Sequence, residues 1–328
     1  TITNTSNFRF VMSIRLMFKR RPMNLWWRSR VVAHSAQFRN KFQFRKNHSE
    51  QFGFTEVPAG EKKKHVGDVF HRVAEKYDLM NDLMSLGVHR LWKESFVQML
   101  NPHRSMHLLD VAGGTGDIGF RFIESLPRSR SSTASPPALS SIPAQHSDSS
   151  SSSSASTSLA PRVTICDINS SMLEVGKKRA KERGYSSNNE HCAIEFAVAD
   201  AEDLPFPSDT FDAYTIAFGL RNVSNIEKAL SEAFRVLKVG GRFLCLEFSH
   251  VESMSLRFLY ELYSETVIPK LGEIVANDKQ SYQYLIESIR LFPEQQQLIE
   301  MMRECRFEST SFTNMSGGVV SVHSGYKL

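Results

Sequence analysis

The sequence is poor in the features that mark several classes of protein. It has four cysteines in 328 residues, and no two of them form a C-x-x-C pair. Most of these cysteines lie in apolar, strand-like stretches, so we favour buried free thiols in a reducing compartment. No run of about 18 apolar residues occurs, so no transmembrane helix is expected. The histidines lack the spacing of metal ligands, which predicts that there is no metal site.

Acidic residues are absent from the first 49 positions, which hold eleven lysines and arginines. This composition is typical of a mitochondrial transit peptide; a disordered basic arm or translated upstream sequence is the alternative. The rest of the chain carries 29 basic residues (40 less 11) against 35 acidic ones. Nucleic-acid-binding domains are usually basic, so no nucleic-acid partner is expected. We predict a leader over residues 1–49 and a folded domain over residues 50–328.

One internal segment has the composition of a disordered chain. Serine accounts for 15 of the 30 residues from 129 to 158, and most of the others are Pro, Ala or Thr. Such a segment buries too little apolar surface to offset the entropy lost on ordering. The cost of closing a loop grows only slowly with its length, so a domain tolerates the insertion. We predict a disordered surface insertion at about residues 128–160.

Short apolar runs alternate with helical patterns over most of the remaining chain. The predicted strands cover residues 107–110, 163–167, 194–200, 211–217 and 242–248, with a terminal antiparallel pair at 307–313 and 319–326. The predicted helices begin at residue 61 and cover 89–100, 117–126, about 170–184, 224–238 and about 255–292. Strands that alternate with helices in this way predict an α/β fold with a mostly parallel sheet.

A glycine-rich loop follows the first of these strands. The strand ends in Asp110, and the glycines after it lead into a helix that starts near Asp117. Glycines let the backbone approach a ligand closely, and residues 114–119 match the dinucleotide pattern G-x-G-x-x-G. By itself this pattern is weak evidence, because a tight turn uses the same residues.

Two further strands also end in acids. Asp167 lies 51 residues after Gly116, or about 20 once the serine-rich segment is left out, which is the interval expected for an acid that binds ribose hydroxyls. Capping of the next helix is the alternative role for such an acid. Asp200, followed by Ala201, is placed to reach an adenine amino group.

NAD is one ligand that this pattern fits, and S-adenosylmethionine (SAM) is another. An acid at the start of the loop, Asp110, is unfavourable beside a pyrophosphate but favourable beside an ammonium group. No segment supplies an evident nicotinamide pocket. The residues therefore favour an adenosyl ligand with an amino-acid tail, which is SAM.

Several longer motifs resemble one family. They are Asp110-x-x-Gly113-x-x-Gly116, Tyr77-Asp78-x-Met80-Asn81-x-x-Met84-Ser85-x-x-x-His89-x-x-Trp92, Phe218-Gly219-Leu220-Arg221-Asn222-Val223, a block at residues 235–249 and Ser281-Tyr282-Gln283-Tyr284-Leu285. Together they resemble the ubiquinone/menaquinone biosynthesis C-methyltransferases, from about residue 61 to the C-terminus. Val239, where many members have proline, and the serine-rich insertion are departures from the family pattern.

The resemblance implies a class I, Rossmann-like methyltransferase with a seven-stranded, mostly parallel sheet, an antiparallel last strand and helices on both faces. It implies SAM as co-substrate, bound by Asp110, Gly113, Thr115, Gly116, Asp167, Asp200 and Ala201. With the basic leader, the chain is similar to the mitochondrial coenzyme Q members, which methylate a ring carbon of 2-methoxy-6-polyprenyl-1,4-benzoquinol. Demethylmenaquinone or another small phenol is the alternative substrate, and a scaffold subunit of a coenzyme Q biosynthetic complex is the alternative role.

The expected chemistry assigns roles to three residues. A ring carbon becomes nucleophilic when the adjacent phenol loses its proton, so the enzyme must position the reactants and assist that loss. Arg221 could stabilise the phenolate or orient a water, and Asn222 could bind a quinol oxygen. The resemblance adds Tyr77 as an active-site partner. A surface salt bridge for Arg221 and a core position for Tyr77 are the alternatives.

The resemblance also implies a location and partners. They are the matrix side of the mitochondrial inner membrane with peripheral attachment, a polyprenylated benzoquinol substrate, other coenzyme Q biosynthesis proteins in a complex, and a homodimer as one oligomeric state.

Overall fold

A computed structural model describes residues 49–73, 81–82, 85, 87–127, 161–186, 192–251 and 279–328. The chain separates into two units, residues 1–50 and 51–328. The predicted leader, apart from Ser49, and the predicted insertion at 128–160 lie outside the described residues. The fold described here is that of the second unit.

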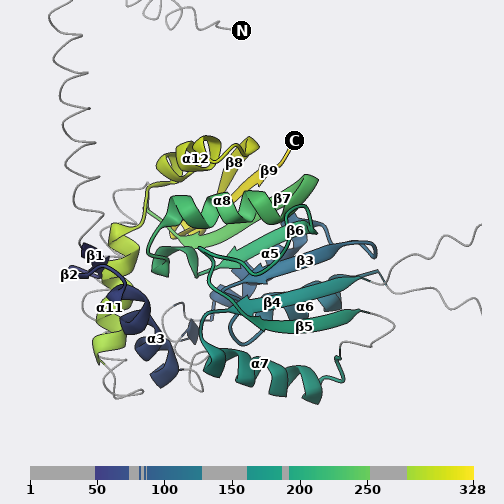
Figure 1. The fold of residues 1–328 in the computed structure, drawn as a ribbon, viewed down its shortest axis with the longest axis horizontal. Coiled ribbons are helices and arrows are strands. Elements are labelled where there is room, and N and C mark those ends of the chain that lie inside the picture. Colours follow the sequence, from purple (N-terminus) through teal and green to yellow (C-terminus); the bar gives the residue numbers. More distant parts are fainter. Residues whose placement is uncertain are drawn as a thin grey trace, which may run out of the picture. The chain divides into compact units, whose positions relative to one another are not determined.

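The second unit is built on a seven-stranded sheet in the order β5-β4-β3-β6-β7-β9-β8 (Figure 1). The strands are β3 (His107–Val111), β4 (Arg162–Asp167), β5 (Ala193–Val198), β6 (Phe211–Ala217), β7 (Leu237–Phe248), β8 (Glu308–Met315) and β9 (Val320–Tyr326). The first five pair in parallel, and β9 runs antiparallel to both of its neighbours, β7 and β8. From β3 the chain adds β4 and β5 on one side of the sheet, and then β6 and β7 on the other side. This order is the doubly wound arrangement. The predicted sheet is confirmed.

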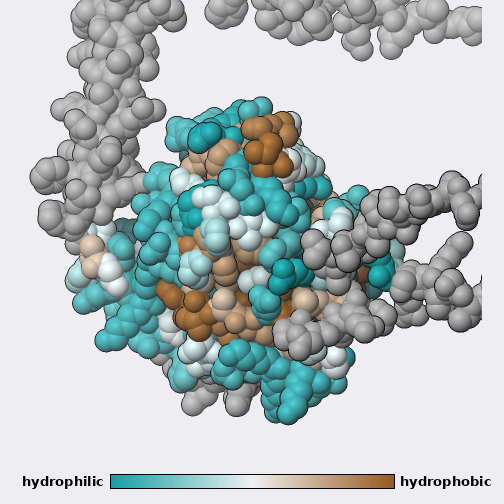
Figure 2. Space-filling model, turned by 45° about the vertical axis from the view of Figure 1, so that its right-hand side comes forward, coloured by the Kyte–Doolittle hydropathy of each residue, from teal (hydrophilic) through white to brown (hydrophobic). Residues whose placement is uncertain are grey.

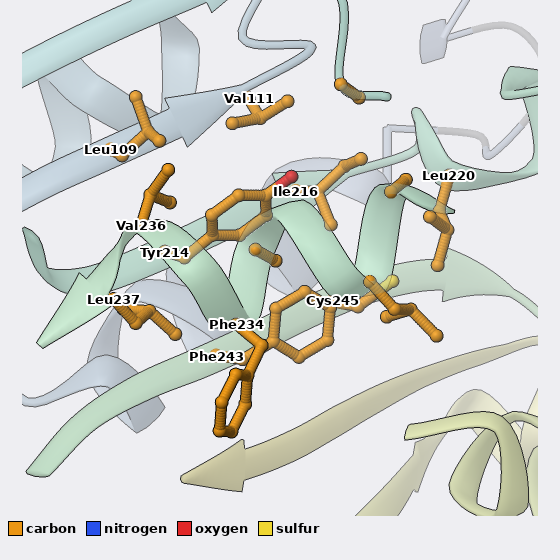
Figure 3. Packing of buried hydrophobic residues seen from close by; sticks show 14 of the residues in the cluster. Leu109, Val111, Tyr214, Ile216, Leu220, Phe234, Val236, Leu237, Phe243 and Cys245 are labelled. Carbon is orange, nitrogen blue, oxygen red and sulfur yellow. The ribbon is translucent and has the colours of Figure 1, made fainter. Parts of the chain in front are cut away.

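The two faces of the sheet carry separate cores because successive side chains on a strand point to opposite faces. Leu108 packs with residues of α5 (His89–Leu100), α6 (Asp117–Ser125) and α7 (Ser170–Glu182). Its neighbour Leu109 packs with residues of α8 (Ile226–Val236) and α12 (Gln295–Glu304). Figure 3 shows this second core, in which the rings of Tyr214 and Phe243 lie with centroids 5.4 Å apart. Helices therefore cover both faces, as predicted.

Helix ends follow local signals where such signals exist. α5 ends where predicted, at Leu100, and the next residue, Asn101, closes the last turn with a left-handed φ of 56°. α7 starts at Ser170, as predicted, because Asn169 caps it by accepting hydrogen bonds from the amides of Ser171 and Met172.

Some boundaries differ from the predictions. α8 ends at Val236 and β7 begins at Leu237, so the predicted helix through residue 238 is two residues too long. Lys327, at the far end of the sequence, donates from Nζ to the carbonyls of Leu237 and Arg235. α12 and the two-stranded sheet of β1 (Ser49–Phe52) and β2 (Thr55–Pro58) were not predicted at all. Of the helix predicted at about 255–292, the described part is α11 (Lys279–Leu291).

α3 (Glu61–Val73) and α11 lie side by side at the edge of the domain (Figure 1). Val66 and Val69 of α3 bury their side chains with Tyr284 of α11.

On the face drawn in Figure 2, hydrophilic residues surround separate groups of hydrophobic ones. In the described part of the chain, no helix combines the length and the apolar character needed to cross a membrane.

Candidate functional site

A cavity with 1050 Å³ of empty space, including its opening to solvent, lies beyond the carboxyl ends of β3, β4, β5 and β6. This is the edge at which doubly wound sheets bind ligands. The predicted site residues that line it are Asp110, Gly113, Thr115, Asp167, Asp200, Ala201 and Asn222. Gly116 and Arg221 lie just outside its wall, and Tyr77 lies outside the described residues. The structure thus brings together acids that are 57 and 33 residues apart in the sequence.

The glycine loop after β3 has no room for side chains. A Cβ on Gly113 would lie 2.7 Å from Ile165 Cγ2 and 2.8 Å from Asp110 Oδ2. Gly116 has a left-handed φ of 88° as the residue before α6, and a Cβ there would lie 2.8 Å from the Phe120 ring. Gly113 therefore lets the loop pack closely on β3 and β4, whereas Gly116 shapes the turn and packs against the helix.

Asp110 is completely buried at the end of β3. Its Oδ1 accepts a hydrogen bond from Thr215 Oγ1 at 2.9 Å, and its Oδ2 makes no well-formed hydrogen bond among the described residues. Burial raises the pKa of this carboxyl to about 7, although the Thr215 hydroxyl and the backbone of Gly119 favour the charged form. A buried carboxylate oxygen without a partner, on the wall of a cavity, is a site for a cationic donor such as an ammonium group.

Asp167 holds the loop that follows β4 against the glycine loop. Its Oδ2 accepts from the Gly114 amide at 3.0 Å and its Oδ1 from the Asn169 amide at 2.8 Å. Burial raises the pKa of Asp167 to about 6, although these amides favour the charged form. Ile168, which also lines the cavity, is 46% exposed and offers an apolar surface beside the carboxylate. A carboxylate next to an apolar surface suits the ribose and adenine of an adenosyl ligand.

Asp200 is already engaged by a residue that the sequence did not single out. Lys63 Nζ of α3 lies 2.6 Å from Asp200 Oδ2 and 3.2 Å from Glu202 Oε2. Asp200 Oδ1 accepts from the Glu202 amide at 2.9 Å. The lysine and Asp200 are about a third exposed, so this ion pair is open to solvent.

α3 forms a wall of the cavity through Val66, Gly67 and Phe70. Lys62 donates from Nζ to the carbonyl of Val223 at 2.7 Å, and Asn169 donates to the carbonyl of Gly67 at 3.2 Å. The loops after β4 and β6 therefore hold this helix over the site. Its apolar periodicity was evident in the sequence, but nothing local revealed which strands it would face.

Arg221 follows β6 in a short 3₁₀ turn (Leu220–Asn222) and is buried. Its Nη1 donates to Glu247 and, at 2.6 Å, to the carbonyl of Phe218, and its Nε has no partner among the described residues. Burial raises the pKa of Glu247 although Arg221 opposes the shift. The alternative of a surface salt bridge is wrong, because both side chains are less than 5% exposed. The guanidinium is fixed in orientation and keeps an unused donor.

Asn222 lines the cavity and is oriented by α11. Tyr284 Oη donates to Asn222 Oδ1 at 3.0 Å, and Asn222 Nδ2 lies 3.4 Å from the carbonyl of Phe218. Since Tyr284 occupies the amide oxygen, the nitrogen is directed as a donor. Tyr284 belongs to the last motif that carried the family resemblance.

The four cysteines, which all lie in the described residues, are free thiols. Cys166, Cys192 and Cys245 are buried and Cys305 is partly exposed, so the predicted buried thiols are confirmed for three of them. Within the described ranges, no group of three His, Cys, Asp or Glu side chains is arranged to hold a metal ion.

Comparison with known proteins identifies relatives that are methyltransferases. The model of the ubiE/COQ5 methyltransferase family matches residues 58–327. The chain is 50% identical over 285 residues to the mitochondrial 2-methoxy-6-polyprenyl-1,4-benzoquinol methylase of Oryza sativa subsp. japonica, which covers 87% of this chain and 90% of that one. It is 48% identical to the Danio rerio protein of the same name, with 85% of each chain covered. It is 46% identical to the ubiquinone/menaquinone biosynthesis C-methyltransferase UbiE of Rhizobium meliloti, with 84% and 94% covered.

A solved structure shares the fold. A SAM-dependent methyltransferase from Thermotoga maritima aligns over 80% of this chain and all of its own, with a TM-score of 0.50 and 18% identity. The cavity fits the same ligand, since it offers a buried acid for an ammonium group, a glycine loop and a second acid beside an apolar surface. The chain therefore belongs to the ubiE/COQ5 methyltransferase family and is a SAM-dependent methyltransferase.

Proposed function

We propose that this enzyme transfers the methyl group of SAM to a ring carbon of 2-methoxy-6-polyprenyl-1,4-benzoquinol in ubiquinone synthesis. The proposal is carried by the identity of 45–50% with mitochondrial proteins named for this activity in plants, a fish and a fly. The test is to incubate the purified protein with methyl-labelled SAM and a short-tailed methoxybenzoquinol, and to locate the label. Label on the ring carbon supports the proposal, and label on an oxygen, or none, contradicts it.

Arg221 and Asn222 are the residues that we assign to the chemistry. Loss of the phenol proton places negative charge on the quinol oxygen, and the ring carbon ortho to that oxygen then attacks the sulfonium methyl group. The methyl–sulfur bond breaks, S-adenosylhomocysteine leaves, and the ring carbon loses its proton to restore the aromatic ring. Arg221 lies just outside the cavity wall, so its positive charge can stabilise that oxygen or orient a water that takes the proton. The amide nitrogen of Asn222 is a donor at the cavity wall. Tyr77 remains the third proposed partner.

This assignment predicts a change in turnover rather than in affinity for SAM. Arg221→Ala is expected to lower kcat by about 10²- to 10³-fold, as for loss of an oxyanion donor, with the Kd of SAM nearly unchanged. Because this variant leaves Glu247 buried without its cationic partner, the control is Arg221→Ala combined with Glu247→Gln, which removes that unpaired charge. Equal losses of turnover and SAM affinity in both variants would reject the role.

The named relative from Rhizobium meliloti also motivates a second substrate. Demethylmenaquinol presents the same phenol next to an unsubstituted ring carbon. Assaying both quinols at equal concentration separates the two, because a menaquinone enzyme would prefer the fused ring. We place the methoxybenzoquinol first, since seven of the relatives compared carry its name.

We further propose that the enzyme works at the matrix side of the mitochondrial inner membrane, attached peripherally, with residues 1–49 as a cleaved leader. The supports are the mitochondrial names of its relatives and a substrate whose polyprenyl tail resides in lipid. Assembly with other coenzyme Q biosynthesis proteins, and a homodimer, belong to the same proposal. Import into isolated mitochondria tests the leader, carbonate extraction tests the peripheral attachment, and cross-linking tests the assembly. Full-length protein that stays outside the organelle, protein that resists extraction, and protein without cross-linked partners would contradict these parts in turn.

A further inference from the structure

A buried group of charges lies at the glycine-loop end of the cavity, on residues to which no role was given above. Lys93 of α5 is 5% exposed and lines the cavity. Its Nζ lies 2.8 Å from Oδ2 of Asp117, the first residue of α6, which also lines the cavity. Arg121, one turn further along α6, donates from Nε to Asp117 Oδ1 at 3.0 Å.

These three side chains carry two positive charges and one negative charge. Although burial raises the pKa of Asp117, the charges of Lys93 and Arg121 lower it below its usual value, so this carboxylate is ionised. His89, on the same helix as Lys93, adds no charge near neutral pH, because burial and the charge of Lys93 lower its pKa to about 4. Asp82 is a further carboxylate near Lys93, but both of its oxygens are held by Arg90. Among the described residues, Lys93 therefore pairs with Asp117 alone and shares it with Arg121.

Lys93 is the member of the group that an anion in the cavity can reach. A buried ammonium group is costly unless it is fully paired, and Asp117 shares its charge with Arg121. The amino end of α6, which Asp117 begins, adds a favourable field for negative charge. On the same cavity wall, Asp110 Oδ2 lacks a partner and suits a positive charge. One end of the cavity thus presents an unpaired acid and an under-paired base.

The amino-acid tail of SAM carries an ammonium and a carboxylate on one carbon. We propose that Lys93 binds this carboxylate while Asp110 receives the ammonium group, so that the two side chains recognise the zwitterion. The proposal rests on the use of SAM as methyl donor and is independent of the quinol. If Lys93 only stabilised the fold by pairing with Asp117, its removal would affect all adenosyl ligands alike.

The test compares two ligands by isothermal titration calorimetry, with no quinol present. SAM carries the carboxylate, whereas decarboxylated SAM keeps the sulfonium, the ammonium and the adenosine but lacks it. We expect Lys93→Met to weaken SAM binding by at least about tenfold, as for loss of a charged hydrogen bond, and to change the decarboxylated ligand by less than about twofold. Equal losses for the two ligands, or no loss for SAM, would overturn the proposal.

Two further measurements test the contact between Lys93 and the carboxylate without relying on Lys93→Met alone. Lys93→Arg retains the charge and is expected to retain most of the preference for SAM; a preference as low as that of Lys93→Met would contradict the contact. If Lys93→Met does not fold, ¹⁵N-lysine NMR of the unaltered protein replaces it, with the Nζ signal identified by its loss in Lys93→Arg. That signal should shift with SAM and not with decarboxylated SAM, and the absence of a shift with SAM overturns the proposal. Failure of the unaltered protein to bind either ligand would refute the methyl donor itself.

Discussion

The two ends of the cavity differ in how the charge of their acidic side chain is compensated. At the glycine-loop end, Asp110 is completely buried, and its Oδ2 makes no well-formed hydrogen bond among the described residues. Burial raises the pKa of this carboxyl to about 7. At the other end, Asp200 is 28% exposed and already paired with Lys63. A buried charge depends on its ligand for compensation, whereas an exposed one is compensated by water and a flexible partner. The same residue type should therefore matter far more at the first end than at the second.

The largest effect is expected at Asp110. Asp110→Asn should weaken SAM binding by about 10- to 150-fold, the range for hydrogen bonds between charged groups. Binding of SAM to the unaltered enzyme should also weaken as pH falls below about 7, because a proton on Asp110 must then be displaced by the ammonium group. The part of this dependence near pH 7 should vanish in Asp110→Asn, whereas the part near pH 6 that belongs to Asp167 should remain. The ligand 5′-methylthioadenosine, which lacks the ammonium group but keeps the ribose, is the control and reports the Asp167 part alone. A dependence for SAM that exceeds that of the control in the variant would contradict the assignment.

The same substitution should stabilise the protein without ligand. The pKa of Asp110 is raised on folding, so its contribution to the free energy of unfolding falls as pH rises through the unfolded value near 3.8 and reaches its lowest level above about 7. Thermal unfolding at pH 8 should therefore occur at a higher temperature in Asp110→Asn than in the unaltered protein, with the difference lost near pH 4. A lower melting temperature at pH 8 would show that the carboxylate is compensated by the protein itself.

Asp167 lies between the two extremes, and so should its effect. Asp167→Ala is expected to weaken SAM binding by at least about tenfold, since it removes an acceptor for the ribose and also frees the Gly114 amide. Asp167→Asn keeps an oxygen for that amide and separates the two contributions. Affinity unchanged in Asp167→Ala would count against the ribose contact. A full loss in Asp167→Asn would place the effect on the ligand rather than on the loop.

Much of this fold could be predicted because its signals are local. β4 and β6, the cap at Asn169 and the end of α5 at Leu100 follow from apolar runs and capping residues within a few positions. The end of α8 is different, since it is stabilised by Lys327, about 90 residues away. α12 could have been predicted, because Glu294 and Gln297 form a capping box at its start.

The site residues also divide into those that local sequence signals could assign and those that only the packed structure reveals. Asp110 and Asp167 could be assigned because each lies at the carboxyl end of its strand, and parallel strands bring their carboxyl ends to one edge of the sheet. Lys63 and Lys93 lie on helices that precede the sheet in sequence, and only the packed structure shows that both face the cavity. The partner of Arg221 was equally hidden, since Glu247 lies on the neighbouring strand β7.

The smallest effect is expected at Lys63, at the exposed end of the cavity. Because an exposed ion pair contributes at most about 1 kcal/mol, Lys63→Met should change the Kd of SAM by less than about fivefold. The direction should be towards tighter binding, because the substitution frees Asp200 Oδ2 for the adenine amino group. Lys64→Met, on the exposed side of the same helix, is the matched control and should leave the Kd unchanged. Calorimetry at low and high salt checks the comparison, since screening should reproduce the effect of Lys63→Met in the unaltered enzyme. A loss of affinity above tenfold would mean that α3 holds the ligand directly and that the two ends of the cavity are not as different as their burial indicates.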